Sequence, residues 1–106
     1  MTEKVPELTN GEFEAFTKQG LVLIDFFAEW CMPCLMMAPI LEELSETMKG
    51  KAKVGKVDVS DNEPIARKFN VSSIPNFTIL KDGKLMEQII GSTSLEELEE
   101  KLKGYL

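Results

Sequence analysis

The sequence contains no histidine and only two cysteines. Structural zinc ions and iron–sulfur clusters need about four thiolate or imidazole ligands, so one copy of the chain cannot hold one unless carboxylates complete the site. The absence of histidine also excludes a cysteine–histidine catalytic pair, and the haem-attachment motif fails because Leu35 follows the second cysteine. Two cysteines can still serve redox chemistry, form a structural disulfide, or remain inert thiols.

Long apolar runs and positive charge are also scarce. No stretch approaches the ~20 apolar residues of a membrane span, and residues 1–10 lack the basic and apolar regions of a secretory signal. With 18 acidic and 12 basic residues the formal net charge is −6, and its field repels nucleic-acid phosphates and anionic lipids. We therefore expect a cytoplasmic protein with no nucleic-acid partner and no membrane association.

What is present is enough for one packed domain. Hydrophobic residues make up 43% of the 106 residues, and no linker, repeat or low-complexity stretch interrupts them. We interpret residues 1–106 as a single domain and expect a monomer.

Hydrophobic patterning predicts a mixed β-sheet. The run at 21–28 (LVLIDFFA) is almost wholly apolar, which is typical of a central strand buried on both faces. Asp82 and Gly83 indicate a tight hairpin, and hence an antiparallel pair. The expected strands are 21–28, 53–58, 76–81 and 84–90, and a short edge strand at Lys4 and Val5 would make a fifth.

Capping boxes and helical spacing predict four helices around this sheet. A capping box pairs a serine or threonine with a glutamate three residues later. The sequence has three of them, at Thr9 and Glu12, Ser60 and Glu63, and Ser94 and Glu97. The expected helices lie near 10–18, at 34–49 with a kink at Pro39, at 60–69 and from 94 onward. The result is an α/β fold, a mixed sheet of four to five strands flanked by helices on both faces, containing a right-handed βαβ crossover.

A glutamate-rich run at 96–100 could be an acidic binding patch or the solvated face of the last helix. We favour the solvated face, because its glutamates are spaced to pair with lysines one turn later. The expected ion pairs are Glu97 with Lys101 and Glu99 with Lys103.

Cys31 and Cys34 lie where the central strand has ended and a helix is starting. This spacing puts both sulfurs on one helix face, within the ~4.4 to 6.8 Å Cα separation that a disulfide requires. Unpaired N–H groups at the start of a helix stabilise an anion, which lowers the pKa of the Cys31 thiol. We therefore assign Cys31 as the nucleophile and Cys34, one turn inside and less exposed, as the resolving thiol.

A purely structural role for this pair is the alternative. A disulfide that closes a loop of about four residues adds only about 2 kcal/mol to the free energy of unfolding, which is a small structural contribution. Inert buried thiols are also a poor fit beside Trp30 and Pro33 at a helix start. The βαβ context of the motif favours redox chemistry.

Two neighbours of the cysteines have further expected roles. Pro33 fixes its own backbone, which rigidifies the dithiol loop, and biases Met32 toward extended geometry. Trp30 offers an amphipathic surface on which a peptide can dock, with core packing as the alternative role.

Asp25 is the only charged residue in the central strand. Burial of a carboxylate raises its pKa, which suits Asp25 to exchange a proton with Cys34, directly or through water. The alternative is a structural ion pair with Lys56 on the neighbouring strand, and the two roles are compatible.

Taken in order, these residues resemble the thioredoxin family from about residue 5 to the C-terminus. The resemblance is carried by Asp25, Trp30, Cys31, Met32, Pro33, Cys34, Lys56, Ile74, Pro75 and Gly91. It implies a thioredoxin-like fold in which Pro75 is cis and lies against the dithiol, and in which the residue before it pairs with an extended substrate. The implied substrate groove consists of Trp30, Met32, Pro33, Ile74, Pro75 and Gly91.

The chain departs from the usual pattern of that family at three positions. Met32 replaces a glycine, Leu35 replaces a basic residue, and Asn76 replaces a threonine. The first two make the rim of the site more apolar and remove a cation. We expect them to affect the reduction potential and the fit to a standard thioredoxin reductase, but not the thiol mechanism.

The expected function is therefore general reduction of protein disulfides at a low potential, with Asp25 and Lys56 assisting the dithiol and no bound cofactor. A thioredoxin reductase or an equivalent donor would recharge it. A glutathione-linked, glutaredoxin-like protein is the alternative enzyme, although Trp30 and Asp25 favour the first reading. A non-catalytic adaptor, which would not need both thiols, and a four-thiolate metal site shared by a dimer are the remaining alternatives.

Overall fold

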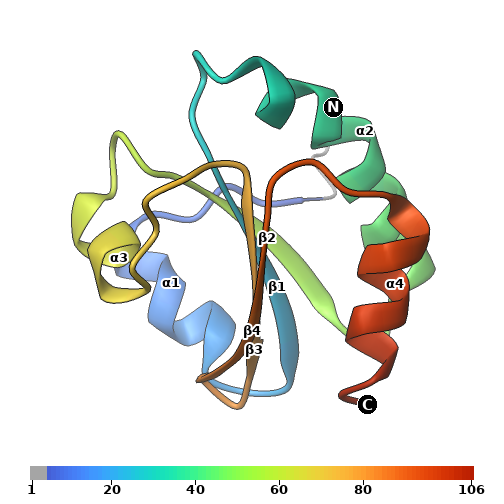
Figure 1. Cartoon of the computed structure of the whole chain (residues 1–106). Helices are drawn as coiled ribbons and strands as arrows, with labels where there is room; N and C mark the ends of the chain where they lie inside the picture. The colour runs from blue at the N-terminus through green and yellow to red at the C-terminus, as the bar shows by residue number, and fades with distance from the viewer. Residues whose placement is uncertain (1–4) are drawn as a thin grey trace.

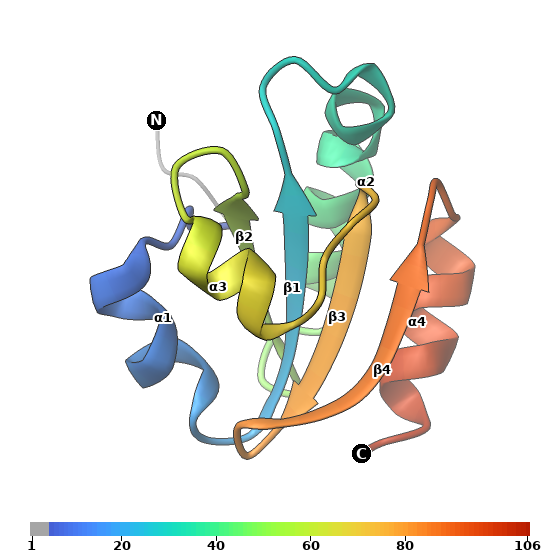
Figure 2. The same ribbon diagram turned by 60° about the vertical axis from the view of Figure 1, so that its left-hand side comes forward.

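Four strands form one mixed sheet in the computed structural model, which describes residues 5–106. They are β1 (Leu21–Phe27), β2 (Lys53–Asp58), β3 (Asn76–Lys81) and β4 (Lys84–Ile90). Their order across the sheet is β2-β1-β3-β4, with β1 and β2 parallel and the other two pairs antiparallel (Figure 2). The predicted mixed sheet and the central place of β1 are confirmed.

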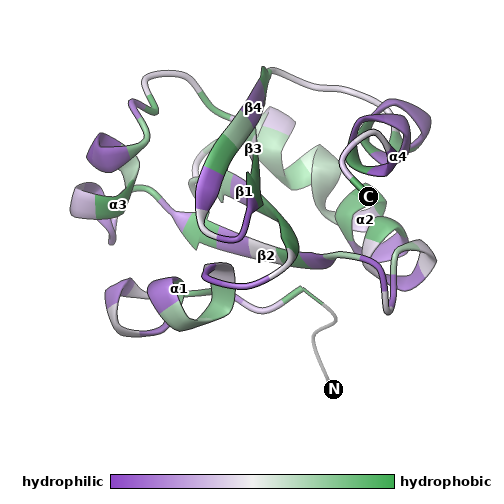
Figure 3. Cartoon of the chain, turned by 90° about the horizontal axis from the view of Figure 1, so that it is seen from below, coloured by the Kyte–Doolittle hydropathy of each residue, from purple (hydrophilic) through white to green (hydrophobic). Residues whose placement is uncertain are grey.

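Four helices cover the two faces of this sheet. They are α1 (Asn10–Thr17), α2 (Met32–Thr47), α3 (Glu63–Lys68) and α4 (Leu95–Lys103). Helices α2 and α4 lie on one face, and α1 and α3 lie on the other (Figure 1). In Figure 3 much of α2 has the hydrophobic colour, whereas α3 and α4 carry more of the hydrophilic colour. Within residues 5–106, no helix has the length and apolar character needed to cross a membrane.

The alternation of side chains along β1 decides which residue faces which helices. Leu21 and Leu23 belong to the core under α2 and α4, whereas Val22, Ile24 and Phe26 belong to the core under α1 and α3. Because successive side chains of a strand point to opposite faces, Asp25 lies on the α2 side with the leucines. The one carboxylate of the central strand is therefore turned toward the helix that carries the cysteines.

Turn and cap chemistry agree with the sequence at three places. The hairpin residues Asp82 and Gly83 have φ values of +52° and +83°, as a tight turn between antiparallel strands requires. The Glu12 carboxylate accepts a hydrogen bond from the Thr9 N–H at 3.0 Å. Ser94 Oγ accepts one from the Glu97 N–H at 3.1 Å.

The cap predicted at Ser60 is wrong. Helix α3 begins at Glu63 with Asn62 as its N-cap. The Ser60 N–H donates instead to Asp58 Oδ1 at 2.8 Å, because the carboxylate at the end of β2 takes the turn that follows it.

One of the two predicted ion pairs on α4 is also wrong. Lys103 pairs with Glu99 at 3.4 Å as expected, but Lys101 Nζ lies 2.9 Å from Glu87 of β4. Glu87 also accepts a hydrogen bond from the Tyr105 hydroxyl at 2.8 Å. These two interactions connect the C-terminal end of α4 and the residues after it to strand β4.

The predicted edge strand falls partly outside the described residues, since Lys4 is not among them. Within residues 5–106 the segment before α1 forms only an isolated parallel bridge, between Glu7 and Lys56. Pro6 has no N–H to donate, which prevents a longer ladder there.

Candidate active site

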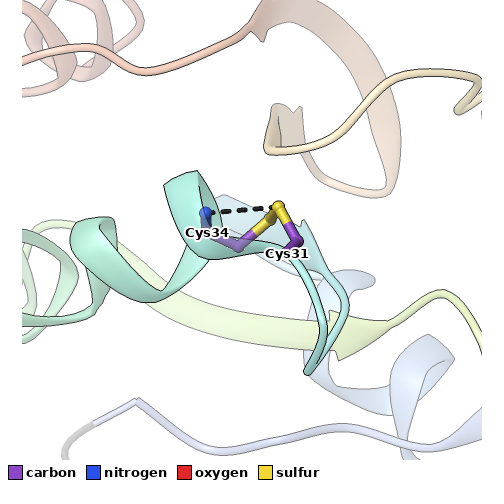
Figure 4. The surroundings of a disulfide bond; sticks show 2 residues. All are labelled: Cys31 and Cys34. Atoms are coloured by element: carbon purple, nitrogen blue, oxygen red, sulfur yellow. Dashed lines mark hydrogen bonds between the residues drawn. A yellow bond between two sulfur atoms is a disulfide. The ribbon is translucent and has the colours of Figure 1, made fainter.

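Cys31 and Cys34 form a disulfide at the start of α2, with their Cα atoms 5.3 Å apart. Cys31 is the N-cap of the helix, and its Sγ accepts a hydrogen bond from the Cys34 N–H at 3.2 Å (Figure 4). The same N–H can stabilise a Cys31 thiolate when the bond is reduced, in addition to the helix dipole. Cys31 is thereby the cysteine whose anion the backbone favours.

The helix begins two residues earlier than expected from the hydrophobic spacing. Met32 is its first residue and is not extended, contrary to the expected influence of Pro33. Pro33 fits in the first helical turn because the N–H it lacks would have no partner there. The Cys31 cap outweighs the usual bias of a residue that precedes proline.

Both sulfur-bearing side chains are buried. Cys34 is 3% exposed and Cys31 is 5% exposed. Cys34 is therefore the less exposed of the two, as expected, but the difference is small. They pack in one cluster with Ala28, against which the side chains of Phe27, Val59 and Ile74 lie. A partner that reaches Cys31 must therefore dock closely on the surrounding surface.

That surface is apolar. Trp30 is 75% exposed, which rules out the core-packing role considered for it. Met32 and Leu35 are exposed beside it, as expected for the apolar rim that these substitutions create.

The loop that precedes β3 also contacts the dithiol. The Ile74–Pro75 peptide bond is cis, as the family resemblance implies, and Ile74 packs against the cysteine cluster. The Gly91 N–H donates to the Pro75 carbonyl at 2.8 Å, and Gly91 has a φ of +95° that favours glycine. Residues far apart in sequence are thus joined at the end of the sheet that carries Cys31.

Asp25 is buried beneath the dithiol. It is 4% exposed, and its Oδ1 has no hydrogen-bond partner among residues 5–106. Burial raises the pKa of Asp25 from 3.8 to about 7, while the charge of Lys56 lowers it in part. The predicted upward shift is confirmed. Lys56 is the register partner of Asp25 on β2, and its Nζ lies 5.5 Å from the centre of the Phe27 ring.

A cavity of about 70 Å³ connects these groups. Asp25, Lys56 and Cys34 all line it. A single buried water needs roughly 10 to 15 Å³ of such volume, so water can bridge the Asp25 carboxyl and the Cys34 sulfur. Of the other lining residues, Leu35 was predicted for the rim of the site, whereas Val5, Phe27, Ala38, Leu41 and Glu42 were not predicted to line it. Helical periodicity from Cys34 could have indicated Ala38, Leu41 and Glu42, which lie on the same face of α2, whereas Val5 and Phe27 join them only through the tertiary fold.

Comparison with known proteins agrees with this geometry. The family profile described as thioredoxin matches residues 4–104. The chain is 46% identical to thioredoxin of Listeria monocytogenes, an alignment covering 96% of this chain and 99% of the relative. It is 43% identical to thioredoxin of Bacillus subtilis, with 96% and 98% coverage. A solved point mutant of thioredoxin from Halobacterium salinarum superposes with a TM-score of 0.87 at 29% identity, covering 99% of this chain and 94% of that one. The chain therefore belongs to the thioredoxin family of thiol-disulfide oxidoreductases, with Cys31 and Cys34 as its redox-active pair.

Proposed function

We propose that the protein reduces disulfides of other proteins, with Cys31 as the attacking thiol. The observation that carries this proposal is the hydrogen bond from the Cys34 N–H to Cys31 Sγ at the start of α2. A donor aimed at one sulfur of the pair favours the anion on that sulfur, and the thiolate is the nucleophilic form.

The reaction then has two exchange steps. The Cys31 thiolate attacks one sulfur of the substrate disulfide, forming a mixed disulfide and releasing the first substrate thiolate. The Cys34 thiolate next attacks the Cys31 sulfur, which closes the internal disulfide and releases the second substrate thiolate. Two electrons have passed to the substrate, and the oxidised protein must be recharged by a dithiol donor.

The second step requires Cys34 to lose a proton inside the protein. Asp25 accepts it through the shared cavity, since a carboxyl with a pKa of about 7 exchanges protons readily at neutral pH. Lys56 assists by favouring the ionised form of Asp25.

Substrates dock where the apolar surface surrounds the buried dithiol. One side of the groove consists of Trp30, Met32 and Pro33. The other side is the loop of Ile74 and Pro75, whose carbonyl at Pro75 accepts a hydrogen bond from the Gly91 N–H. The protein acts as a cytoplasmic monomer, and a thioredoxin reductase or an equivalent donor recharges it. The net charge of −6 and the absence of a cation at Leu35 weaken anion stabilisation, which supports a low potential and hence a reductant.

The test is turnover of a soluble protein disulfide with the purified protein and a small dithiol as donor. Reduction should be much faster than with the dithiol alone, and Cys31→Ser should abolish the acceleration. Trials with NADPH and a thioredoxin reductase, or with glutathione, then identify the donor class. Full acceleration by Cys31→Ser would overturn the proposal.

A further inference from the structure

Among residues 5–106, the two most exposed methionines lie beside the dithiol. Residues 5–106 contain five methionines. Met32 is 65% exposed and Met36 is 70% exposed, whereas Met37 and Met48 are buried. Met86 on β4 is 42% exposed and lies outside the proposed groove. The two most exposed methionines of residues 5–106 are therefore both in the first turns of α2.

Met32 and Met36 are four residues apart in one helix, so they are neighbours on the same face. We call this pair the methionine rim. Trp30, which precedes the rim in sequence, and Leu35, which lies between its two methionines in sequence, are also exposed. The first turn of α2 carries no acidic residue. A partner that reaches the buried Cys31 must cover this surface, and flexible thioethers adapt well to apolar segments of varied shape.

An exposed thioether is also chemically reactive. Hydrogen peroxide transfers one oxygen to the sulfur, so that the O–O bond breaks, an S–O bond forms and water leaves. The sulfur is oxidised by two electrons and the peroxide is reduced by two. The product is a polar sulfoxide whose oxygen binds water and must lose it when an apolar partner docks.

We infer that the methionine rim is a modification site, at which oxidation by peroxide weakens the docking of protein disulfides with apolar flanks. The inference rests on the proposed reductase function and adds its regulation. Oxidising conditions would thereby slow the delivery of electrons to protein substrates even after the disulfide between Cys31 and Cys34 has been reduced again. Methionine sulfoxide reductases would restore the rim.

The experiment begins with the protein in its disulfide form, in which both cysteines are protected from peroxide. The whole protein is treated with hydrogen peroxide, the peroxide is removed, and sulfoxide at each methionine is quantified by peptide mass spectrometry. The disulfide is then reduced, and kcat/KM is measured with a protein disulfide and with a small soluble disulfide. The small compound serves as the control, because it does not cover the rim.

We expect sulfoxide to form at Met32 and Met36 before Met37 and Met48. For the protein substrate, kcat/KM should fall by roughly fivefold to 150-fold, the range expected when one polar group is desolvated without a partner. The small disulfide should react at an unchanged rate. Treatment with methionine sulfoxide reductases should restore the activity toward the protein substrate.

Variants assign the effect to the rim. Each is compared with its own untreated sample, since Met32 belongs to the proposed groove. The double variant Met32→Leu, Met36→Leu should lose no activity on treatment, because leucine keeps the surface apolar and cannot be oxidised. Met86→Leu should lose as much as the parent, which excludes an effect of the exposed methionine on β4.

The possible failures are distinguishable. Absence of turnover in the untreated protein overturns the proposed function, and this inference with it. Unchanged kcat/KM after full oxidation of Met32 and Met36, or an equal loss in the double leucine variant, overturns the inference alone. An equal loss toward the small disulfide also overturns it, because the damage then lies in the dithiol and not in docking.

Discussion

Asp25 and Cys34 line the same cavity of about 70 Å³, Asp25 from the central strand and Cys34 from the first turn of α2. The cavity gives the carboxyl a route to the resolving sulfur, and the surrounding burial raises its pKa to about 7. Burial thus creates a base suited to neutral pH, but it also places an unfavourable charge in the core when that base is ionised.

Replacement of Asp25 by asparagine should stabilise the oxidised protein at neutral and alkaline pH. The pKa of Asp25 is higher in the folded than in the unfolded protein, so the folded state binds more protons between pH 3.8 and about 7. Stability therefore falls by about 1.4 kcal/mol per pH unit across that window in the parent, but not in the variant.

Urea denaturation at several pH values measures this difference. We expect no pH-dependent stabilisation below about pH 3, where Asp25 is protonated in both states, and a plateau on the order of 4 kcal/mol above pH 7. A stability difference that does not change with pH would show that the Asp25 carboxyl is not desolvated as described.

The same substitution should slow resolution. Asparagine cannot accept the Cys34 proton, so the second exchange step loses its base while the Cys31 attack is little affected. Rapid mixing with a protein disulfide, followed by quenching, should show the mixed disulfide accumulating in Asp25→Asn. General acid-base catalysis accounts for roughly 100-fold or more in such steps. A resolution rate equal to that of the parent from about pH 6 to 9 would leave Asp25 with a structural role only.

Lys56 should shift this pH dependence in a defined direction. Its charge lowers the pKa of Asp25, so Lys56→Met should move the inflection in the resolution rate to higher pH. Lys53→Met is a matched control, because it removes the same charge from an exposed position on the same strand. An inflection that stays in place in Lys56→Met would argue against coupling between Lys56 and Asp25.

The uncharged rim should keep the reduction potential low. Leu35→Lys places a cation beside the dithiol, which stabilises the Cys31 thiolate and makes the protein more oxidising. An exposed charge is worth up to ~1 kcal/mol, so we expect an increase on the order of 20 mV. Equilibration with glutathione redox buffers measures it, and Met86→Lys controls for net charge. An equal increase in both variants would mean that local charge at Leu35 is not the cause.

Much of the fold could be predicted because local chemistry and global packing agree in it. The apolar run of β1 and the turn residues Asp82 and Gly83 allow few alternatives, and the strands 53–58, 76–81 and 84–90 have the bounds expected. The errors arose where another partner competed with the expected one, a neighbour in sequence in the first case and a residue of another element in the second. The Asp58 carboxylate accepts a hydrogen bond in the turn where Ser60 was expected to cap a helix. Lys101 pairs with Glu87 and not with Glu97.

The site divides in the same way. Cys31, Cys34 and the raised pKa of Asp25 follow from a motif and from one charge in an apolar strand. The burial of Cys31 under Val59 and Ile74 could not be read from the sequence, because it depends on loops brought together by the sheet. Likewise, the approach of Gly91 to Pro75 came only from family resemblance, since no periodicity links residues on separate segments.

The most direct test of the account is trapping of the mixed disulfide. A substrate with a single disulfide is mixed with Cys34→Ser or with Cys31→Ser, and the adducts are mapped by non-reducing mass spectrometry. We predict that Cys34→Ser accumulates a stable adduct through Cys31, because the attacking thiol remains and the resolving thiol is gone. We predict little adduct with Cys31→Ser. Predominant trapping through Cys34 would contradict the assignment of Cys31 as the nucleophile.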